Sequence, residues 1–294
     1  MNTYEAKYPV NSLSREIRGL SYCIHTWGKQ DNPPLFLLHG WADTGLSFQF
    51  VADELGQDYF LIAPDWRGFG DSEWSPQGYW FPDYLGDLDE IVEQYANGDK
   101  ARIAGHSMGG NVGCLYAGIR KDKVSHLASL DVFGLPASDP SQAPGRYEKW
   151  LDQLKDNPSY STYEDMETLL KHIRKLAPGI NEESAAFIAR AWAKPLPDQR
   201  GFTIKADPAH KRVNPVLYRR EEARSCWQGI HAKTLFIYGE DSRIYQTYLE
   251  EGYQQESREC IPGLLEETIA DAGHMLHWQQ PRVLAAKLKQ FFEL

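Results

Sequence analysis

A serine set between glycines at two-residue spacing is the strongest chemical signal in the sequence. GHSMG at 105–109 ends an apolar run, ARIAGHS at 101–107, and precedes a segment of small and apolar residues, 109–121. A serine on a sharp strand-to-helix turn needs glycines two residues before and after it, because the backbone there has no room for a β-carbon. The turn exposes the hydroxyl, and the helix N-terminus favours developing negative charge. We therefore predict that Ser107 is a nucleophile and not an incidental residue of a glycine-rich turn.

A second turn could stabilise the charge that such a nucleophile creates. The sequence LFLLHGW at 35–41 places a glycine directly after an apolar run. Two backbone N–H groups must face the oxyanion that forms when a serine attacks a carbonyl carbon. Gly40 would let the chain turn so that the Trp41 N–H points inward beside the Met108 N–H. We predict these two N–H groups as an oxyanion hole.

A serine nucleophile also needs a base, and His274 is the best placed of the nine histidines. It follows the strand-like segment TIADAG and precedes a predicted helix, so its ring could swing back to the strand ends. The base would take the proton from Ser107 and return it to the leaving group. His277, three residues later, is the alternative. The remaining candidates have predicted structural positions: His106 beneath the serine turn, His39 in the oxyanion loop, and His25 and His126 on core strands.

These residues must be positioned by a sheet, and the apolar runs predict one. Buried strands are expected at 35–40, 59–65, 101–107 and 126–134, with a helix at 81–96 between two of them. Alternating strands and helices of this kind indicate a mostly parallel sheet flanked by helices, an α/β fold.

The strand pattern is interrupted between residues 136 and 230. Prolines and charged stretches with apolar residues at helical spacing replace the buried runs there. The strand pattern resumes at 233–241 and 264–275, and an amphipathic helix at 282–294 closes the chain. We predict a core formed by residues 1–135 and 231–294, with a mostly helical insertion at 136–230.

The order of four motifs resembles that of the α/β-hydrolase family. The motifs are HGW at 39–41, DWRGFGDS at 65–72, GHSMGG at 105–110 and AGHMLHWQQP at 272–281. The resemblance implies the α/β-hydrolase fold and a base at His274. It also implies that the insertion forms a helical cap. It also implies that Asp65 and Arg67 hold a loop that supports the active site by hydrogen bonds.

The acid that orients the base has two leading candidates. Many family members carry it after the seventh strand in a G-x-x-D turn, but here Ser242 occupies the aspartate position and Asp241 comes one residue early. Other members carry the acid after the sixth strand, where Asp131 ends an apolar run 24 residues after Ser107. A buried carboxylate at a strand end needs a partner. We predict Asp131, with Asp241 as the alternative and Glu240 as a more remote one.

Composition narrows the choice of partner. A net charge of −10 and a pI near 5.4 argue against nucleic-acid binding, which selects a basic face. The sequence contains no apolar run of 18 residues, so no membrane span is predicted. The N-terminal segment lacks the apolar core of a signal peptide, so a cytoplasmic location is expected. The four cysteines are scattered, and we predict neither a metal nor a cofactor.

The expected function is a serine hydrolase that cleaves carboxylic esters or thioesters through an acyl-enzyme. Aromatic residues in the insertion suit a small-molecule substrate with an apolar acyl or alcohol group; they are Trp150, Trp192, Phe202, Tyr218 and Trp227. Two alternatives remain open, a carbon–carbon bond hydrolase on the same fold and a non-catalytic ligand-binding protein on a hydrolase scaffold. The serine disfavours dehalogenases and epoxide hydrolases, which use an aspartate nucleophile.

Overall fold

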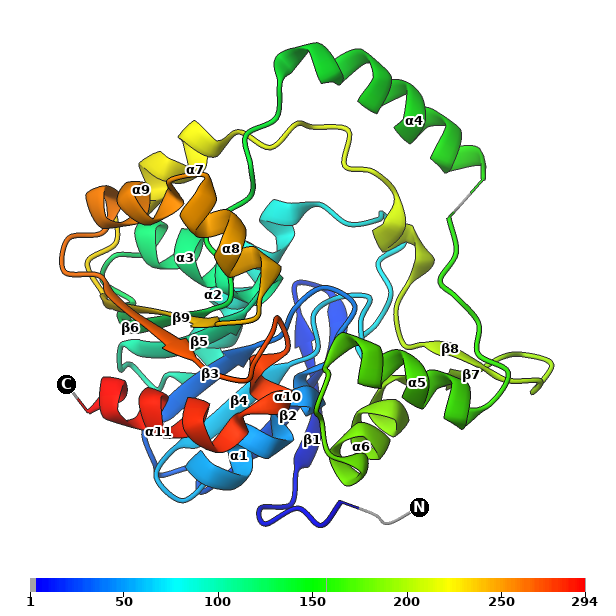
Figure 1. Ribbon diagram of the computed structural model, residues 1–294, viewed down its shortest axis with the longest axis horizontal. Coiled ribbons are helices and arrows are strands. Elements are labelled where there is room, and N and C mark those ends of the chain that lie inside the picture. The colour runs from blue at the N-terminus through cyan, green and yellow to red at the C-terminus, as the bar shows by residue number, and fades with distance from the viewer. Residues whose placement is uncertain (1–3, 157, 294) are drawn as a thin grey trace.

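An eight-stranded sheet forms the centre of the protein, whose computed structural model describes residues 4–156 and 158–293 (Figure 1). The strand order is β1-β2-β4-β3-β5-β6-β9-β10. The first two pairs are antiparallel and all later pairs are parallel. The strands are β1 (Asn11–Ile17), β2 (Leu20–Trp27), β3 (Pro34–Leu38), β4 (Phe60–Pro64), β5 (Ala101–His106), β6 (Val124–Leu130), β9 (Lys233–Gly239) and β10 (Leu265–Ile269). The mostly parallel sheet predicted from the apolar runs is confirmed.

Helices cover both faces of this sheet, which explains why its central strands are apolar throughout. Leu35 and Leu37 pack in one core cluster with α1 and α11, whereas Phe36 and Leu38 pack in the other with α2 and α3. This alternation along β3 is the two-residue period of a strand buried on both sides. The helices of these layers and of the sheet edge are α1 (Gln49–Leu55), α2 (Phe81–Tyr95), α3 (Met108–Ile119), α7 (Arg220–Trp227), α8 (Arg243–Glu250), α9 (Tyr253–Cys260), α10 (Leu276–Gln279) and α11 (Pro281–Phe292).

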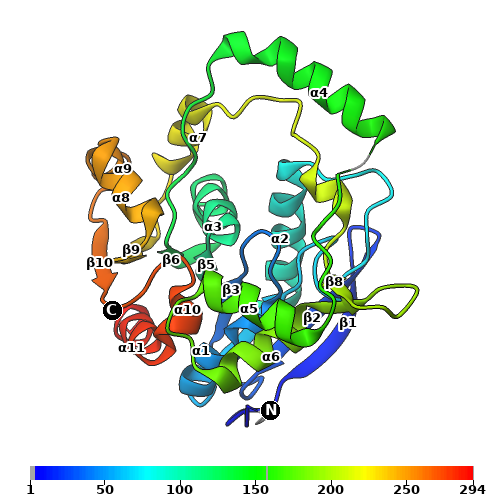
Figure 2. The same cartoon turned by 45° about the vertical axis from the view of Figure 1, so that its right-hand side comes forward.

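The segment between β6 and β9 contributes no strand to the eight-stranded sheet. It contains α4 (Ala143–Lys155), α5 (Met166–Leu176), α6 (Glu182–Trp192) and a short hairpin, β7 (Ala193–Pro195) with β8 (Phe202–Ile204). In both views α4 is the outermost element and stands apart from the sheet and its flanking helices (Figures 1 and 2). The last helix, α7, packs instead on α3, since a β-carbon on Gly118 would lie 1.9 Å from the Cys226 carbonyl oxygen.

A histidine from this segment is inserted among aromatic rings of the core. The His210 ring stacks between Phe69 and Tyr79, at centroid distances of 3.8 and 3.5 Å, and its Nε2 donates to the Arg67 carbonyl oxygen at 3.0 Å. Tyr79 donates to Asp207 at 2.7 Å. The segment is therefore held to the core by ring stacking as well as hydrogen bonds.

This insertion of His210 predicts a loss of stability in acid. Burial lowers its pKa from 6.5 to about 3, so the imidazole stays neutral in the folded protein and becomes protonated on unfolding. Stability should then fall as the pH drops below 6.5 towards 3, by up to about 1.4 kcal/mol per pH unit for this one group. Urea unfolding of the wild type and of His210→Phe between pH 7 and 4 tests this. The variant should show the shallower pH dependence, and parallel curves would contradict the assignment.

Candidate active site

Ser107 lies on the strained turn that its sequence motif predicts. Its backbone has φ 51° and ψ −117° between β5 and α3, in a region that side-chain-bearing residues rarely occupy. A β-carbon on Gly105 would lie 2.4 Å from the Gly109 carbonyl oxygen, and one on Gly109 would lie 2.2 Å from the Leu38 carbonyl oxygen. The neighbouring backbones therefore require both glycines, and the turn presents the Ser107 side chain at the carboxyl ends of the strands.

His274 bridges Ser107 and a buried carboxylate. Its Nε2 lies 3.2 Å from Ser107 Oγ, and its Nδ1 lies 2.6 Å from Asp131 Oδ2. A carboxylate can only accept, so Asp131 fixes the tautomer with the proton on Nδ1. The Nε2 lone pair then faces the serine hydroxyl. The His274 side chain is 39% exposed and that of Asp131 is fully buried, so the base reaches solvent while its partner does not.

Asp131 follows β6 at φ 55° and receives further hydrogen bonds from the end of β9 and from the turn before α8. Ser242 Oγ donates to it at 2.6 Å and the Gly239 N–H at 3.2 Å. These donors offset the desolvation of a fully buried carboxylate. Asp241 is exposed, and no hydrogen bond joins it to His274 among the described residues. The structure therefore brings together Ser107, His274 and Asp131 and leaves the alternative carboxylate outside the group.

Ser242, which the sequence marks as a departure from the family pattern, has a direct role in this arrangement. Besides donating to Asp131, its hydroxyl accepts from the Ile244 N–H at 3.1 Å and caps α8. A serine in the position of the displaced aspartate is the signal that could have revealed this contact.

Removing that hydroxyl should weaken the orientation of the base. We expect Ser242→Ala to lower kcat about tenfold and to cost about 1–2 kcal/mol of stability, because Asp131 loses a donor and α8 loses its cap. Ser242→Thr keeps a hydroxyl and should stay within about threefold of the wild type. Steady-state kinetics and urea unfolding of both variants provide the measurement. Equal activity for the wild type and Ser242→Ala would refute this role.

The predicted oxyanion loop lies against the nucleophile. A β-carbon on Gly40 would lie 3.1 Å from Ser107 Cβ, so only glycine permits this approach without displacement. Met108 is the first residue of α3, and its N–H has no acceptor within the helix. Within the ranges 4–156 and 158–293, no hydrogen-bond acceptor is found for the Trp41 N–H. The segments that carry both predicted donors therefore lie beside Ser107, and their role as an oxyanion hole stays a prediction.

Comparison with known proteins agrees with this geometry. The family model for the α/β-hydrolase fold matches residues 33–281. The chain belongs to the α/β-hydrolase fold family. The predicted fold is thereby confirmed.

Relatives of this hydrolase-family chain include proteins with hydrolase names. A serine hydrolase-like protein of Danio rerio is 24% identical over 288 residues, which cover 95% of this chain and 85% of the relative. A 3-hydroxybutyrate-oligomer hydrolase of Cupriavidus necator is 34% identical over 144 residues, 48% of this chain and 47% of the relative.

Solved structures share the fold at low sequence identity. A thioesterase domain from the curacin biosynthetic pathway has a TM-score of 0.85 at 24% identity, covering 96% of this chain and 99% of that domain. A thermophilic esterase from Thermogutta terrifontis has a TM-score of 0.70 at 18% identity, covering 96% and 98%. In the described part of this chain, no helix has the length and apolar character needed to cross a membrane.

Among the described residues of this α/β-hydrolase chain, His274 is the one histidine whose side chain is within hydrogen-bond distance of Ser107 Oγ. His277, the alternative base, is fully buried with its Nε2 3.6 Å from Asp43 Oδ2, and burial lowers its pKa. His25 is buried on β2; burial opposes its charged form, but Asp65 raises its pKa to about 10. His39 is also buried. His126 lies half-buried on β6.

Asp65 and Arg67 stabilise the loop after β4 as predicted. Asp65 accepts from the N–H groups of Gly45 and Asp71 at 2.7 and 2.9 Å. Arg67 donates twice to the buried Asp87 carboxylate, from Nε at 2.6 Å and from Nη2 at 2.5 Å. Both side chains are committed to structural bonds, so they hold the hydrolase loop rather than face the nucleophile.

Two clusters of metal-ligating side chains lie in the interior, within the described residues. Each brings its ligand atoms within 4.8 Å of one another; they are Cys23, His25 and Asp65, and Asp43, His106 and His277. The carboxylate of each already accepts hydrogen bonds from protein donors. We therefore assign no metal to either cluster.

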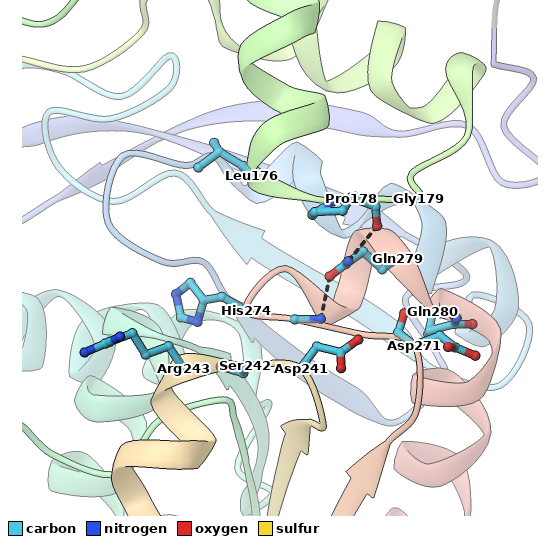
Figure 3. A pocket seen from close by; sticks show the side chains of 11 residues that line it. Leu176, Pro178, Gly179, Asp241, Ser242, Arg243, Asp271, His274, Gln279 and Gln280 are labelled. Atoms are coloured by element: carbon cyan, nitrogen blue, oxygen red, sulfur yellow. Dashed lines mark hydrogen bonds between the residues drawn. The ribbon is translucent and has the colours of Figure 1, made fainter.

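A polar pocket opens beside His274. It has a volume of about 500 Å³, and the segment between α5 and α6 forms one of its walls. In the close view (Figure 3), the side chains of His274 and Arg243 extend to one side, whereas those of Asp241 and Asp271 lie on the other. Gln279 lies between Pro178, in the wall formed by the segment between α5 and α6, and the chain segment that carries His274.

The predicted pocket aromatics divide into interior and surface residues. Trp227 packs on Phe133 at a centroid distance of 4.2 Å, and Trp192 packs on Trp278 at 5.4 Å. Both are buried, so they support the inserted segment from within. Trp150, Phe202 and Tyr218 are partly exposed, on α4, on β8 and before α7.

Proposed function

We propose that this protein is a serine hydrolase that cleaves carboxylic esters or thioesters through an acyl-enzyme on Ser107. The observation that carries the proposal is the hydrogen-bonded series from Ser107 Oγ to His274 Nε2, at 3.2 Å, and from His274 Nδ1 to Asp131 Oδ2, at 2.6 Å. This is the arrangement in which a base activates a hydroxyl while a carboxylate orients the base.

Acylation follows from this arrangement. Ser107 Oγ attacks the carbonyl carbon as His274 Nε2 takes the hydroxyl proton. Asp131 stabilises the imidazolium that forms. The N–H groups of Trp41 and Met108 stabilise the tetrahedral oxyanion, and the protonated His274 donates to the leaving alcohol or thiol.

Deacylation uses the same groups in reverse. His274, whose side chain is 39% exposed, takes a proton from water as the water oxygen attacks the acyl carbonyl carbon. Collapse of the second tetrahedral intermediate expels Ser107 Oγ, which regains its proton from His274. The products are a carboxylic acid and an alcohol or thiol, and no cofactor enters this scheme.

Exposed apolar side chains support an apolar substrate group. Trp41, in the predicted oxyanion loop, is 47% exposed. Leu135, four residues after Asp131, is 51% exposed. The outer helix α4 carries an exposed apolar stripe at helical spacing, formed by Tyr147, Leu151 and Leu154. We propose that residues 136–230 act as a cap on a core of residues 1–135 and 231–294, and that the stripe contacts the acyl or alcohol group.

The names of related proteins point to the same bond types. One structural neighbour is named a thioesterase domain, another an esterase, and one relative a hydrolase of 3-hydroxybutyrate oligomers. These names support including both oxygen and sulfur esters among the proposed substrates.

A chain-length series tests the function. Initial rates would be measured on p-nitrophenyl acetate, butyrate and octanoate, and on acyl thioesters followed by a thiol reagent, with Ser107→Ala as control. We expect turnover that depends on Ser107 and rises with acyl length beyond acetate. Absence of turnover on every ester and thioester, together with absence of labelling by a fluorophosphonate probe, would refute the proposal.

A further inference from the structure

The chain segment that carries the base His274 is partly exposed, so contacts with neighbouring residues must fix its position. Residues 270–275, here called the base loop, connect β10 to the short helix α10. The His274 side chain contacts Asp131 and Ser107, and the loop backbone makes three hydrogen bonds with side chains from outside the loop. The longest, at 3.3 Å, runs from Gln280 to the Asp271 carbonyl oxygen; the two shorter ones, at His274 and its neighbour Gly273, involve His106 and Gln279. A displacement of about 1 Å at such a loop can cost a reaction about 100-fold in rate, so these backbone contacts matter for the base.

The first contact comes from beneath the nucleophile. His106 Nε2 lies 2.7 Å from the carbonyl oxygen of His274. A carbonyl oxygen can only accept, so His106 carries its proton on Nε2 and donates. Burial lowers the pKa of His106 well below its ordinary value, which keeps the ring neutral with a single N–H. The residue next to the nucleophile in sequence thus holds the backbone of the base.

The second contact comes from the side of the inserted segment (Figure 3). Gln279, the last residue of α10, accepts from the Gly273 N–H at 2.9 Å through its side-chain oxygen. The nitrogen of the same amide donates to the Pro178 carbonyl oxygen at 2.9 Å. Pro178 lies between α5 and α6, so one amide joins the base loop to the inserted segment.

A buried cluster fastens α10 to the same segment at another point. Asp43 accepts from Trp192 Nε1, at the end of α6, at 2.9 Å and from Ser47 Oγ at 2.8 Å. Ser47 Oγ lies 3.4 Å from Nε2 of His277, which belongs to α10. The helix that follows the base is therefore attached to the inserted segment through Asp43 as well as through Gln279.

We propose that His106 and Gln279 are positioning residues that hold the base loop in its reactive place, and that Gln279 couples the cap segment around Pro178 to His274. His106 fixes the loop from the core and Gln279 fixes it from the cap. The proposal rests on the proposed function, because a base is assumed. It adds that the loop is fully reactive only when the contacts from His106 and Gln279 are both made.

The contribution of His106 can be tested with a matched pair of variants. His106→Leu removes the donor, whereas His106→Gln places an amide N–H near the position of Nε2. We expect His106→Leu to lower kcat for p-nitrophenyl butyrate about 10- to 100-fold with KM within about twofold, and His106→Gln to recover kcat to within about fivefold of the wild type. In His106→Leu the acid limb of kcat/KM should move to lower pH, because a displaced imidazolium is less stabilised by Asp131.

The contribution of Gln279 separates into its two bonds. Gln279→Leu loses both, and we expect kcat to fall about tenfold with the same movement of the acid limb. Gln279→Glu keeps an acceptor for the Gly273 N–H but has no donor for the Pro178 carbonyl oxygen. It should therefore keep kcat within about threefold of the wild type while KM rises, because the cap is released but the base loop is still held.

The outcomes distinguish this proposal from the function on which it rests. If the wild type turns over esters and Ser107→Ala does not, the proposed function stands. If His106→Leu or Gln279→Leu then matches the wild type in kcat and in the acid limb of kcat/KM, the positioning role of that residue is wrong. The positioning role is equally wrong if either variant loses activity only in proportion to its folded fraction, measured by thermal unfolding.

Discussion

Replacing Ser107 with alanine is expected to lower kcat for p-nitrophenyl butyrate by about 10³- to 10⁶-fold. Without Oγ no acyl-enzyme can form, and only the oxyanion-binding N–H groups and substrate binding still favour hydrolysis by water. KM should change little, since the hydroxyl is lost from the reacting centre and not from the apolar contacts. Initial rates at saturating ester, with enzyme concentrations raised for the variant, give the measurement.

Folding of this variant serves as its control. Alanine at φ 51° has the same backbone strain as serine, so the thermal midpoint should remain close to that of the wild type. Ser107→Gly, which relieves the strain, should unfold at a higher temperature than either while remaining equally inactive. Retention of more than about a tenth of the wild-type kcat in Ser107→Ala would contradict the nucleophile assignment.

Replacing Asp131 with asparagine is expected to lower kcat by about 10³- to 10⁴-fold. Asparagine has nearly the shape of aspartate, but its amide NH₂ can donate to Nδ1 and so favour the tautomer with the proton on Nε2. That proton would face Ser107 Oγ, and the base could no longer accept the hydroxyl proton. The charge that stabilises the imidazolium would also be lost.

The matched control is Asp241→Asn, at the carboxylate that the sequence offered as the alternative acid. Asp241 is exposed and no hydrogen bond joins it to His274 in the described part of the chain, so its replacement should leave kcat within about threefold of the wild type. Both variants would be assayed side by side over pH 5 to 9. If Asp241→Asn is the crippled variant and Asp131→Asn is not, the assignment of the acid is reversed.

Much of this arrangement could be predicted from local patterns. The glycines at 105 and 109 are demanded by close backbone contacts within and beside the turn, and such constraints are visible as residue types at fixed spacing. Strands such as β3 are buried on both faces, so they appear in the sequence as continuous apolar runs. The positions of Ser107 and His274 at strand ends followed from these two patterns together.

The remainder depends on contacts between segments distant in the chain. Ser242 lies 111 residues from Asp131, and its place in the aspartate position of the turn is a local signal that does not name the distant carboxylate its hydroxyl reaches. The bond from Gln279 to Pro178 spans 101 residues and joins the end of one helix to a loop of the inserted segment. Such contacts are set by how layers pack, and a one-dimensional pattern does not record packing.

The aromatic residues of the inserted segment also show what the sequence could not predict, namely which of them could contact a substrate. Trp192 and Trp227 sit on helices with apolar faces, and their sequence context is the same for a pocket-lining residue as for a packing residue. The structure shows that both are packing residues, because Trp192 donates a hydrogen bond to Asp43 and Trp227 packs on Phe133.

Identification of the residue labelled by a fluorophosphonate probe tests the central claim most directly. The probe reacts only with an activated nucleophile, so the purified protein would be labelled, digested and analysed by mass spectrometry. A serine hydrolase built on Ser107 predicts a single adduct on the peptide that contains this residue, absent from Ser107→Ala and formed far more slowly in Asp131→Asn. An adduct on another residue, or no adduct in a folded protein, would contradict the account.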